Sequence, residues 1–322
     1  MIPDFTIAAN GQDISALLRD RLLSLTVTDE AGYQSDALEI RLDNRNSRIA
    51  LPAKGAALTV ALGYRDTGLL PTGSYTVDEL QLQGPPQTLT IRAHAANMIA
   101  TLKEPRERSW DDISLGNLVT TISAEHELTA RVAPELAGRM LEHIDQTESD
   151  LHLLTRLARE YGAVAKPAHG FLIFAPRSEA KSVSGSLLAP VTLNINDITS
   201  YRVTLADRDR YGSVVARWQD TATGNQVQVT AGIGKPVYNV RRAYPDAQSA
   251  QRAARVKLAD LNRGTGTVYL NLPGRVELGA ETPLDLNAFG DGIDGRWIVT
   301  RATHTLNKRG LVSRIEAQTG IT

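Results

Sequence analysis

Short runs in which apolar and polar residues alternate constrain this chain most, because they occur toward both of its ends. Alternation with a period of two places every second side chain on the same face of a β-strand. Several such strands at close spacing, separated by turn residues, predict a β-barrel or a β-sandwich. In the first hundred residues the apolar positions are Leu25 and Val27, then Leu38, Ile40 and Leu42, then Leu58, Val60, Leu62 and Tyr64, then Tyr75 and Val77, and finally Leu89 and Ile91.

The period changes in the middle of the chain, where His143–Phe174 predicts an amphipathic helix followed by a β-hairpin. Thr147 is expected to cap the helix, and Asp150 is expected to accept hydrogen bonds from free backbone N–H groups of its first turn. Gly162 is expected to end the helix, since glycine adopts the left-handed conformation at little cost. The expected buried face carries Leu151, Leu154, Ala158 and Tyr161. The two strands of the hairpin are expected at residues 164–166 and 171–174.

Alternation resumes after residue 190 and is interrupted by one long helix, expected at about residues 246–263. The sequence therefore predicts a mainly β protein with an α+β insert between two β domains. The first β domain is expected at residues 1–102, the insert with a Ser-, Ala- and Lys-rich linker at 103–190, and the second β domain at 191–322.

The two β domains share one local pattern, in which an alternating strand precedes a Gly-x-aromatic-x-Val run. This pattern predicts that the β domain is duplicated within the chain. The alternative is that any two hairpins share so short a pattern. The runs are Gly73-Ser-Tyr75-Thr-Val77 after the strand with Leu58 and Val60, and Gly295-Arg-Trp297-Ile-Val299 after the strand with Leu284 and Leu286.

The composition of this 322-residue chain excludes several classes of function. A formal net charge of −1 creates no global field that would attract nucleic acid or an anionic membrane. The absence of cysteine excludes disulfides, thiolate metal sites and cysteine nucleophiles. No apolar stretch approaches the ~20 residues that a transmembrane helix needs, and the first residues do not resemble a secretory leader. We therefore expect no direct membrane insertion.

Candidate catalytic and metal-binding residues are few. None of the six histidines forms a His-Glu-x-x-His pair, and neither a phosphate-binding loop nor a dinucleotide fingerprint occurs. We therefore expect no catalytic centre, no metal and no cofactor. An envelope-associated β protein that binds or hydrolyses carbohydrate remains the alternative in a different class.

The helix region also carries the most specific resemblance to a known family. The run HIDQTESDLHLLTRLA, from His143 to Ala158, is similar to the late control protein D family. Ser109-Trp110 resembles the start of the family's insert, and Trp297–Leu306 resembles its closing Trp-x-Val-x-x-x-x-His-x-Leu strand. Members of this family are baseplate hub proteins of contractile-tailed phages, related to the base of the valine-glycine repeat spikes of type VI secretion. The positions that carry the resemblance are Trp110, His143, Gln146, Asp150, Leu151, Leu154, Trp297 and His304.

The resemblance implies two β-barrel domains related to tail-tube subunits, which flank the helix-plus-hairpin insert. It also implies a homotrimer whose six β domains form a pseudo-six-fold ring between the central spike and the tail tube. The implied partners are the spike, the tube, the tape measure and other baseplate proteins, with DNA only as passing cargo. The implied location is the tail baseplate of a virion or a tailocin, assembled in the cytoplasm of the bacterial host.

Trp297 and His304 lie seven residues apart in the closing strand. An odd separation in a regular strand places two side chains on opposite faces. We therefore expect Trp297 in the core of the second β domain and His304 on the other face, hydrogen-bonded at a subunit boundary. A β-bulge between them would reverse this assignment.

Overall fold

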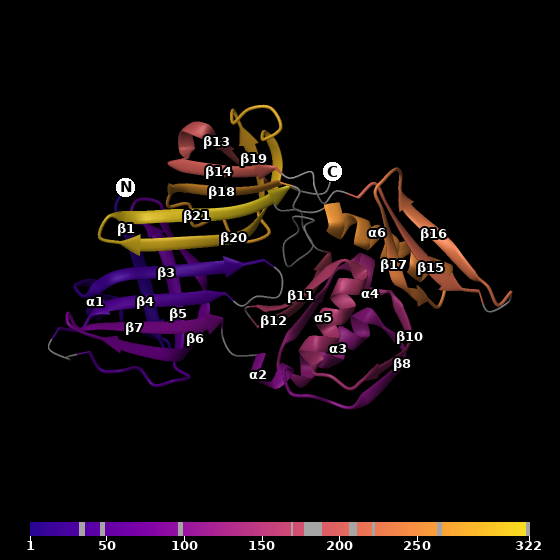
Figure 1. The fold of residues 1–322 in the computed structure, drawn as a ribbon. Coiled ribbons are helices and arrows are strands. Elements are labelled where there is room, and N and C mark those ends of the chain that lie inside the picture. The colour runs from indigo at the N-terminus through magenta and orange to yellow at the C-terminus, as the bar shows by residue number, and fades with distance from the viewer. Residues whose placement is uncertain are drawn as a thin grey trace.

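The computed structural model describes residues 1–31, 36–45, 49–95, 99–168, 170–176, 189–205, 211–220, 223–262 and 266–319. Most of the expected linker at 177–190 lies outside the described residues. Figure 1 shows three bodies of structure: a large sheet built from both ends of the chain, a helix-containing insert beside it, and a small sheet with one helix beyond the insert.

The first β region alternates as the sequence predicts, and its inward side chains form one core. Leu25, Leu42, Leu62 and Leu89 are fully buried there. Its elements are β1 (Pro3–Ala9), β2 (Gln12–Asp13), α1 (Ser15–Arg19), β3 (Leu22–Glu30), β4 (Ala37–Asp43), β5 (Ala57–Tyr64), β6 (Gly68–Gln83) and β7 (Thr88–Ala95).

The insert has its own core, in which two helices pack on two small sheets. β8 pairs with β10, and β12 lies between β11 and β9. Its elements are α2 (Ile99–Leu102), β8 (Arg108–Ser114), α3 (Leu115–Glu125), β9 (Thr129–Val132), α4 (Pro134–Ala137), β10 (Met140–Gln146), α5 (Asp150–Tyr161), β11 (Ala163–Ala168) and β12 (Phe171–Pro176).

The C-terminal part of the chain divides between two cores. The strands that belong to the large sheet are β13 (Val191–Asn194), β14 (Ser200–Leu205), β18 (Gly266–Pro273), β19 (Pro283–Asn287), β20 (Gly295–Asn307) and β21 (Gly310–Thr319). A separate sheet with its own hydrophobic cluster contains β15 (Ser213–Gln219), β16 (Gln226–Gly232) and β17 (Val237–Tyr244), covered by α6 (Ala247–Asn262).

The long helix therefore lies elsewhere than the sequence suggested. We expected it within the second β domain, but α6 packs on its own sheet and beside α5 of the insert. The guanidinium of Arg252 lies 4.8 Å from the centre of the Tyr161 ring, and Gly162 faces Val256 closely. Hydrophobic periodicity identified the helix correctly but carries no information about which surface the apolar face covers.

β20 joins the two ends of the chain into one sheet. β21 pairs along one edge of β20, while β19 pairs with residues 295–298 and β3 with residues 301–307 of the opposite edge. The main path runs β14-β18-β21-β20-β3-β4-β7-β6-β5-β1-β2, with β13 and β19 branching from β20. Among the described strands the first and last strands of this path do not pair with each other, so the sheet is open. The expected pair of separate closed barrels is therefore not found among them.

The strand order supports the predicted internal repeat. Neighbours in the first β region are β1, β5, β6, β7, β4 and β3, and neighbours in the second are β13, β19, β20, β21, β18 and β14. When the strands of each set are numbered along the chain, both orders become 1-4-5-6-3-2. The sets differ at the first pair, since β1 and β5 are antiparallel whereas β13 and β19 are parallel.

The Gly-x-aromatic-x-Val runs occupy matching places in this repeat. A β-bulge directly follows Val77 in β6 and directly follows Val299 in β20. The Tyr75 hydroxyl donates to the carbonyl of Thr72 over 3.0 Å, and Trp297 Nε1 donates to the carbonyl of Ile293 over 2.8 Å. Each buried aromatic ring therefore satisfies its polar atom through the chain just before it.

The bulge in β20 overturns the assignment of Trp297 and His304 to opposite faces. Trp297 and Val299 point inward before the bulge, and Ala302 and His304 point inward after it. One extra residue reverses the parity of a strand, so two residues seven apart share a face. His304 is buried and bonds Ser313 over 2.8 Å.

The helix of the insert begins two residues later than expected. Ser149 is the N-cap, because its hydroxyl accepts from the backbone N–H of His152, and Thr147 is not. Gly162 ends the helix in the left-handed conformation, as predicted. The buried face is Leu153, Leu154, Leu157 and Ala158, so Leu154 and Ala158 were assigned correctly, whereas Leu151 and Tyr161 lie at its half-buried margin.

Replacement of Leu154 by alanine is expected to destabilise the protein by about 2–5 kcal/mol, the range for a buried leucine. Leu154 is fully buried in the core of the insert. Arg159 is exposed on the same helix, so Arg159→Ala is the matched control and should change stability little. Urea unfolding of both variants measures the difference, and equal effects would contradict the assigned face.

Candidate functional site

Three of the eight positions singled out by sequence come together in one buried network in the insert. Trp110 on β8 and Gln146 on β10 meet Asp150 at the start of α5. Trp110 Nε1 donates to Gln146 Oε1 over 2.9 Å, and Gln146 Nε2 donates to Asp150 Oδ1 over 2.7 Å. Gln146 and Asp150 of the family-like run, together with Trp110, therefore hold β8, β10 and α5 together.

Asp150 is the centre of this network. Its side chain is buried and lies at the first position of a helix, where a carboxylate is favoured by the helix dipole. Arg108 Nη2 donates to Oδ1 over 2.6 Å, and His126 Nε2 donates to Oδ2 over 2.8 Å. Arg106 Nε lies 3.3 Å from Oδ2.

The pKa of Asp150 is lowered by these partners. Burial alone raises the pKa of the carboxyl group, but hydrogen bonds from His126 and Gln146 and the charges of Arg108 and Arg106 outweigh burial. Donors that bind the charged form favour ionisation of a carboxyl group. Asp150 is therefore a carboxylate that is held ionised, which suits an ion-pair centre and not a proton donor.

The same cluster offers one candidate for a metal site. Among the described residues, Glu125, His126 and Asp150 place one ligand atom each within 4.8 Å of one another. Arg108 donates to both Glu125 and Asp150, and Arg106 donates to Glu125. Two guanidinium groups thus already neutralise the carboxylates that a cation would need, so the donor set fits an internal ion-pair network.

Sequence reasoning missed the basic half of the network. Arg106 and Arg108 lie in the charged segment KEPRERSW and were not among the residues that the sequence singled out. The signal was present, because Arg106-Glu-Arg108 comes just before Ser109-Trp110, which resembles the start of the family's insert. Arg108 also stacks its guanidinium 4.3 Å from the Trp110 ring centre. Only the fold shows that α3 brings His126 to the same carboxylate.

His143, Leu151 and Leu154 lie outside the network. His143 is exposed on β10, where its Nδ1 lies 2.5 Å from Asp111 Oδ1 and its Nε2 lies 3.2 Å from Asp145 Oδ1. Hydrogen bonds to Asp111 and Asp145 raise the pKa of the histidine. Leu151 and Leu154 pack into the core of the insert.

A second ion cluster ties the insert to the large sheet. Lys166 on β11 donates to the carbonyl of Glu30 over 2.7 Å and to Asp36 Oδ1 over 2.8 Å, and lies 3.6 Å from Asp29. Burial lowers the pKa of Lys166, but the carboxylates of Asp36 and Asp29 outweigh burial and raise it. Asp29 also accepts the backbone N–H of Ala280 over 2.8 Å. The insert hairpin and both β regions therefore meet at one half-buried charge cluster.

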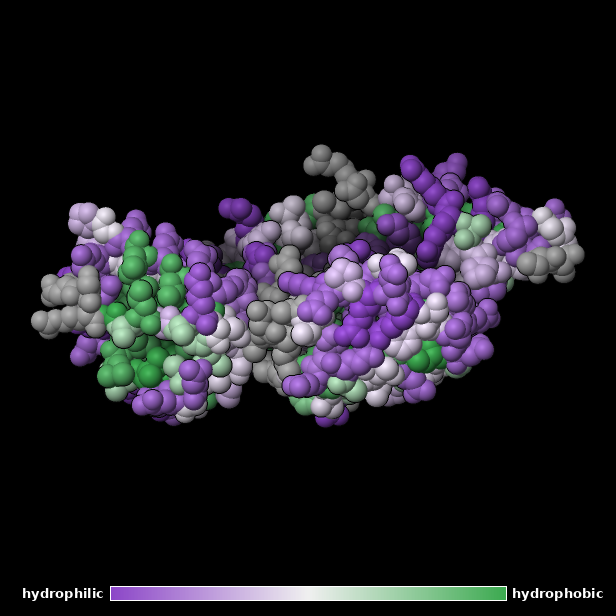
Figure 2. All heavy atoms as spheres, turned by 90° about the horizontal axis from the view of Figure 1, so that it is seen from below, coloured by the Kyte–Doolittle hydropathy of each residue, from purple (hydrophilic) through white to green (hydrophobic). Residues whose placement is uncertain are grey.

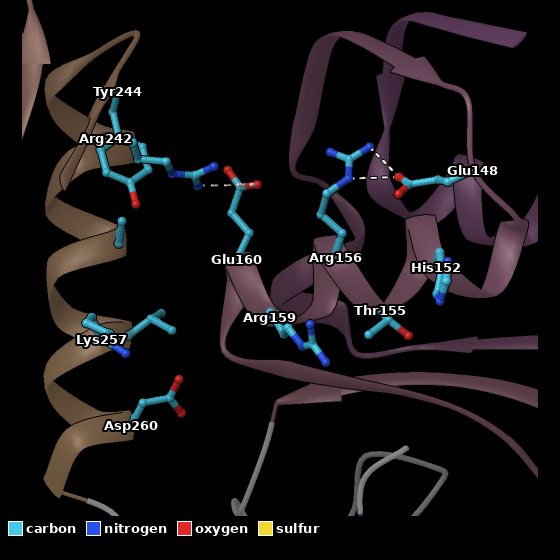
Figure 3. Close-up of a pocket in the computed structure, with 12 residues that line it drawn as sticks. Glu148, His152, Thr155, Arg156, Arg159, Glu160, Arg242, Tyr244, Lys257 and Asp260 are labelled. Carbon is cyan, nitrogen blue, oxygen red and sulfur yellow. Dashed lines mark hydrogen bonds and ion pairs between the residues drawn. The ribbon is translucent and has the colours of Figure 1, made fainter. Parts of the chain in front are cut away.

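A cavity of about 510 Å³ lies between α5 and α6. Figure 3 shows its wall as alternating acidic and basic side chains from the two helices and their neighbours. Arg156 Nη2 pairs with Glu148 over 2.8 Å, and Arg242 Nη2 lies 3.9 Å from Glu160. Acidic and basic side chains are present in nearly equal number, so the charges of the cavity wall largely cancel. The cavity lies where the insert meets the helix that covers the small sheet.

None of the helices in the described part of the chain combines the length and apolar character that crossing a membrane requires.

Comparisons with known proteins show which protein family the chain matches. Residues 71–310 match the family described as phage tail baseplate hub (GPD). The chain is 34% identical to the probable baseplate hub protein of Escherichia phage 186, over 99% of this chain and 93% of that protein.

Two solved structures show the same fold at low sequence identity. The 43 kDa tail protein of prophage MuSo2 from Shewanella oneidensis has a TM-score of 0.76 at 16% identity and covers 98% of each chain. A component of the type VI secretion system of E. coli, which exhibits structural similarity to the T4 tail proteins gp27 and gp5, has a TM-score of 0.58 at 11% identity. That match covers 98% of this chain and 77% of the other.

Replacement of Asp150 by alanine is expected to destabilise the protein by roughly 1–3 kcal/mol, because buried His126 and Gln146 lose their acceptor and Arg108 loses one of its two carboxylate partners. Asp145→Ala removes an exposed carboxylate of the preceding strand and is the matched control, with a small expected effect. Thermal unfolding of the two variants tests this, and a tolerated Asp150→Ala would show that the network does not stabilise the insert.

The stability contributed by His304 should depend on pH. Burial lowers the pKa of His304 to about 4, against an ordinary value of 6.5. The folded state thus binds a proton less readily than the unfolded chain, so this contribution is present above pH 6.5 and is lost as pH falls toward 4. The full loss is roughly 3 kcal/mol at ~1.4 kcal/mol per pKa unit.

Chemical unfolding at pH 7 and pH 5 measures this dependence. His304→Gln should flatten the difference in unfolding free energy between the two pH values, because glutamine does not titrate. If the pH dependence of the unfolding free energy is unchanged in His304→Gln, other titratable groups cause it.

Proposed function

Because the chain belongs to the phage tail baseplate hub (GPD) family, we propose that three copies form a pseudo-six-fold ring that joins the central spike to the tail tube. The ring would present six like β domains to the first tube layer and nucleate tube assembly. Its partners would be the spike, the tube, the tape measure and other baseplate proteins. DNA would pass through as cargo.

The observation that carries this proposal is the repeated strand order of the two β regions. Two like β domains per chain are what a three-fold assembly needs to present six similar units to a six-fold tube. Closed cyclic assemblies are the common form of soluble oligomers. The matching bulges after Val77 and Val299 support the equivalence of the two regions.

This arrangement indicates which part of the chain lies in the ring and which part lies outside it. We assign the two β regions, formed by β1–β7 and by the large-sheet strands β13, β14 and β18–β21, to the ring as domains related to tube subunits. The described elements of the insert, α2 to β12, lie to one side of the large sheet, so we place the insert on the outside of the ring (Figure 1). The near-neutral net charge of −1 suits a channel, since a strongly basic lumen would retain DNA through counterion release.

The envelope-associated alternative has no support in this family, whose members are structural hub proteins. The ion pairs of the insert stabilise its own fold and do not converge on a substrate-sized apolar cavity. We therefore propose no catalytic activity for the chain.

A density map of the assembled particle tests the ring directly. We expect three copies of this chain in the hub layer, each with both β regions against the tube junction. Cells that lack the hub gene should produce no tubes, and expression of the gene from a plasmid should restore them. Six copies in the hub layer, or one β region per chain at the junction, would contradict the proposal.

A further inference from the structure

Two strands of the large sheet, β14 and β6, are equivalent to the two strands of a contact that already exists inside the chain. Within the chain, β3 of the first β region pairs with residues 301–307 of β20 in the second. The strand equivalent to β20 in the first region is β6, and the strand equivalent to β3 in the second region is β14. β5 pairs with β6 only as far as Thr76, and β14 pairs only with β18 among the described strands.

Paired positions across the two regions fix which residues are equivalent. Val27 is followed across the first sheet by Leu38, Ala93 and Val77. Val203 is followed across the second by Val268, Ala317 and Val299 in the same order. Val203 therefore corresponds to Val27, and Val77 to Val299. Counting on from the bulges makes Leu82 equivalent to His304 and Gln83 equivalent to Thr305.

The internal contact is buried, whereas its two equivalents are open. Leu25 and Val27 on β3 and His304 on β20 are each at most 3% exposed. At equivalent positions Tyr201 is 44% and Leu82 is 59% exposed. Leu205, the counterpart of Asp29, is 55% exposed. Figure 2 shows exposed apolar side chains gathered on the first β region in the view from below. Open strand edges with apolar side chains are sites of pairing with another chain.

We infer that β14 of one copy pairs antiparallel with residues 80–83 of β6 in a second copy, in the register of the internal contact between β3 and β20. This inference rests on the proposed ring and assigns its subunit interface. It places Leu82 opposite Val203, Leu80 opposite Leu205 and Gln83 opposite Arg202. The inward pairs are apolar and the outward pair is polar, which matches the two faces of the sheet.

The contact is head-to-tail, since each copy offers β14 at one end of its sheet and β6 near the other. Such contacts form rings when the rotation closes. Closure would also convert the open path of the large sheet into a continuous one, which leaves no unpaired strand at either seam. β6 of the second copy would therefore pair with β14 in the way that β20 pairs with β3 within one chain.

The absence of cysteine in the chain permits a clean cross-linking test. Gln83 and Arg202 are exposed and correspond to Thr305 and Thr26, whose hydroxyl oxygens lie 3.3 Å apart inside the chain. The double variant Gln83→Cys/Arg202→Cys is built into purified tail particles and oxidised with copper phenanthroline. We expect covalent species of two and three chains on a non-reducing gel.

Control variants distinguish the proposed strand register from a general closeness of the two strands. Each single variant should remain a single chain, and Gln83→Cys/Ser200→Cys, shifted by two residues, should yield far less product because a disulfide needs Cβ atoms about 4 Å apart. Hydrogen exchange of wild-type protein gives a reading without any substitution. Amides of residues 80–83 and 200–205 that do not donate to β7 or β18 should exchange slowly in particles and rapidly in the isolated chain.

Different failures are distinguishable. Particles that contain three hub copies but give no cross-link with the matched pair, or equal product with the shifted pair, would overturn the strand pairing and leave the ring in place. Unprotected amides at 200–205 in such particles would have the same meaning. A hub copy number other than three, counted by mass spectrometry of the same particles, would overturn the proposed ring itself.

Discussion

The backbone hydrogen bonds along β20 are the interaction on which the rest of the structure depends. One edge of this strand is completed by β21, and the other is shared between β19 of its own region and β3 of the other. An unpaired strand edge buried in a protein is costly, because each N–H and C=O group loses its hydrogen bond to water. β20 thus makes the two β regions one sheet, and it does so with residues more than 270 positions apart in sequence.

The β-bulge after Val299 decides how that edge is used. Before it, Trp297 fills the core of the second region and, after it, Ala302 and His304 face the same side against β3. A bulge bends the strand and increases its twist, which suits the passage from one region to the next. The same bulge after Val77 in β6 leaves an equally shaped edge with no partner in the described chain.

The insert is stabilised in a different way, through two clusters of charged side chains. Asp150 accepts hydrogen bonds from side chains on β8, β10 and α3, and Lys166 fixes the insert hairpin to the carboxylates near the junction. A buried charge is tolerated where several donors or acceptors share it, and the geometry of each group then constrains its neighbours. The Asp150 network holds the elements of the insert together, and the Lys166 cluster joins the insert to the large sheet.

The sequence alone determined the alternating strands, the helix that ends at Gly162, the repeated Gly-x-aromatic-x-Val run and the family, because periodicity, glycine conformation and motif order are local properties. Tertiary structure decided the rest. A single bulge reversed the face of His304, Ser149 replaced Thr147 as the cap, α6 packed beside α5, and Arg106, Arg108 and His126 converged on Asp150. The Ser149 cap is a local contact with His152, but each of the other outcomes depends on contacts between residues distant in sequence, and no local pattern encodes which partner lies across the contact.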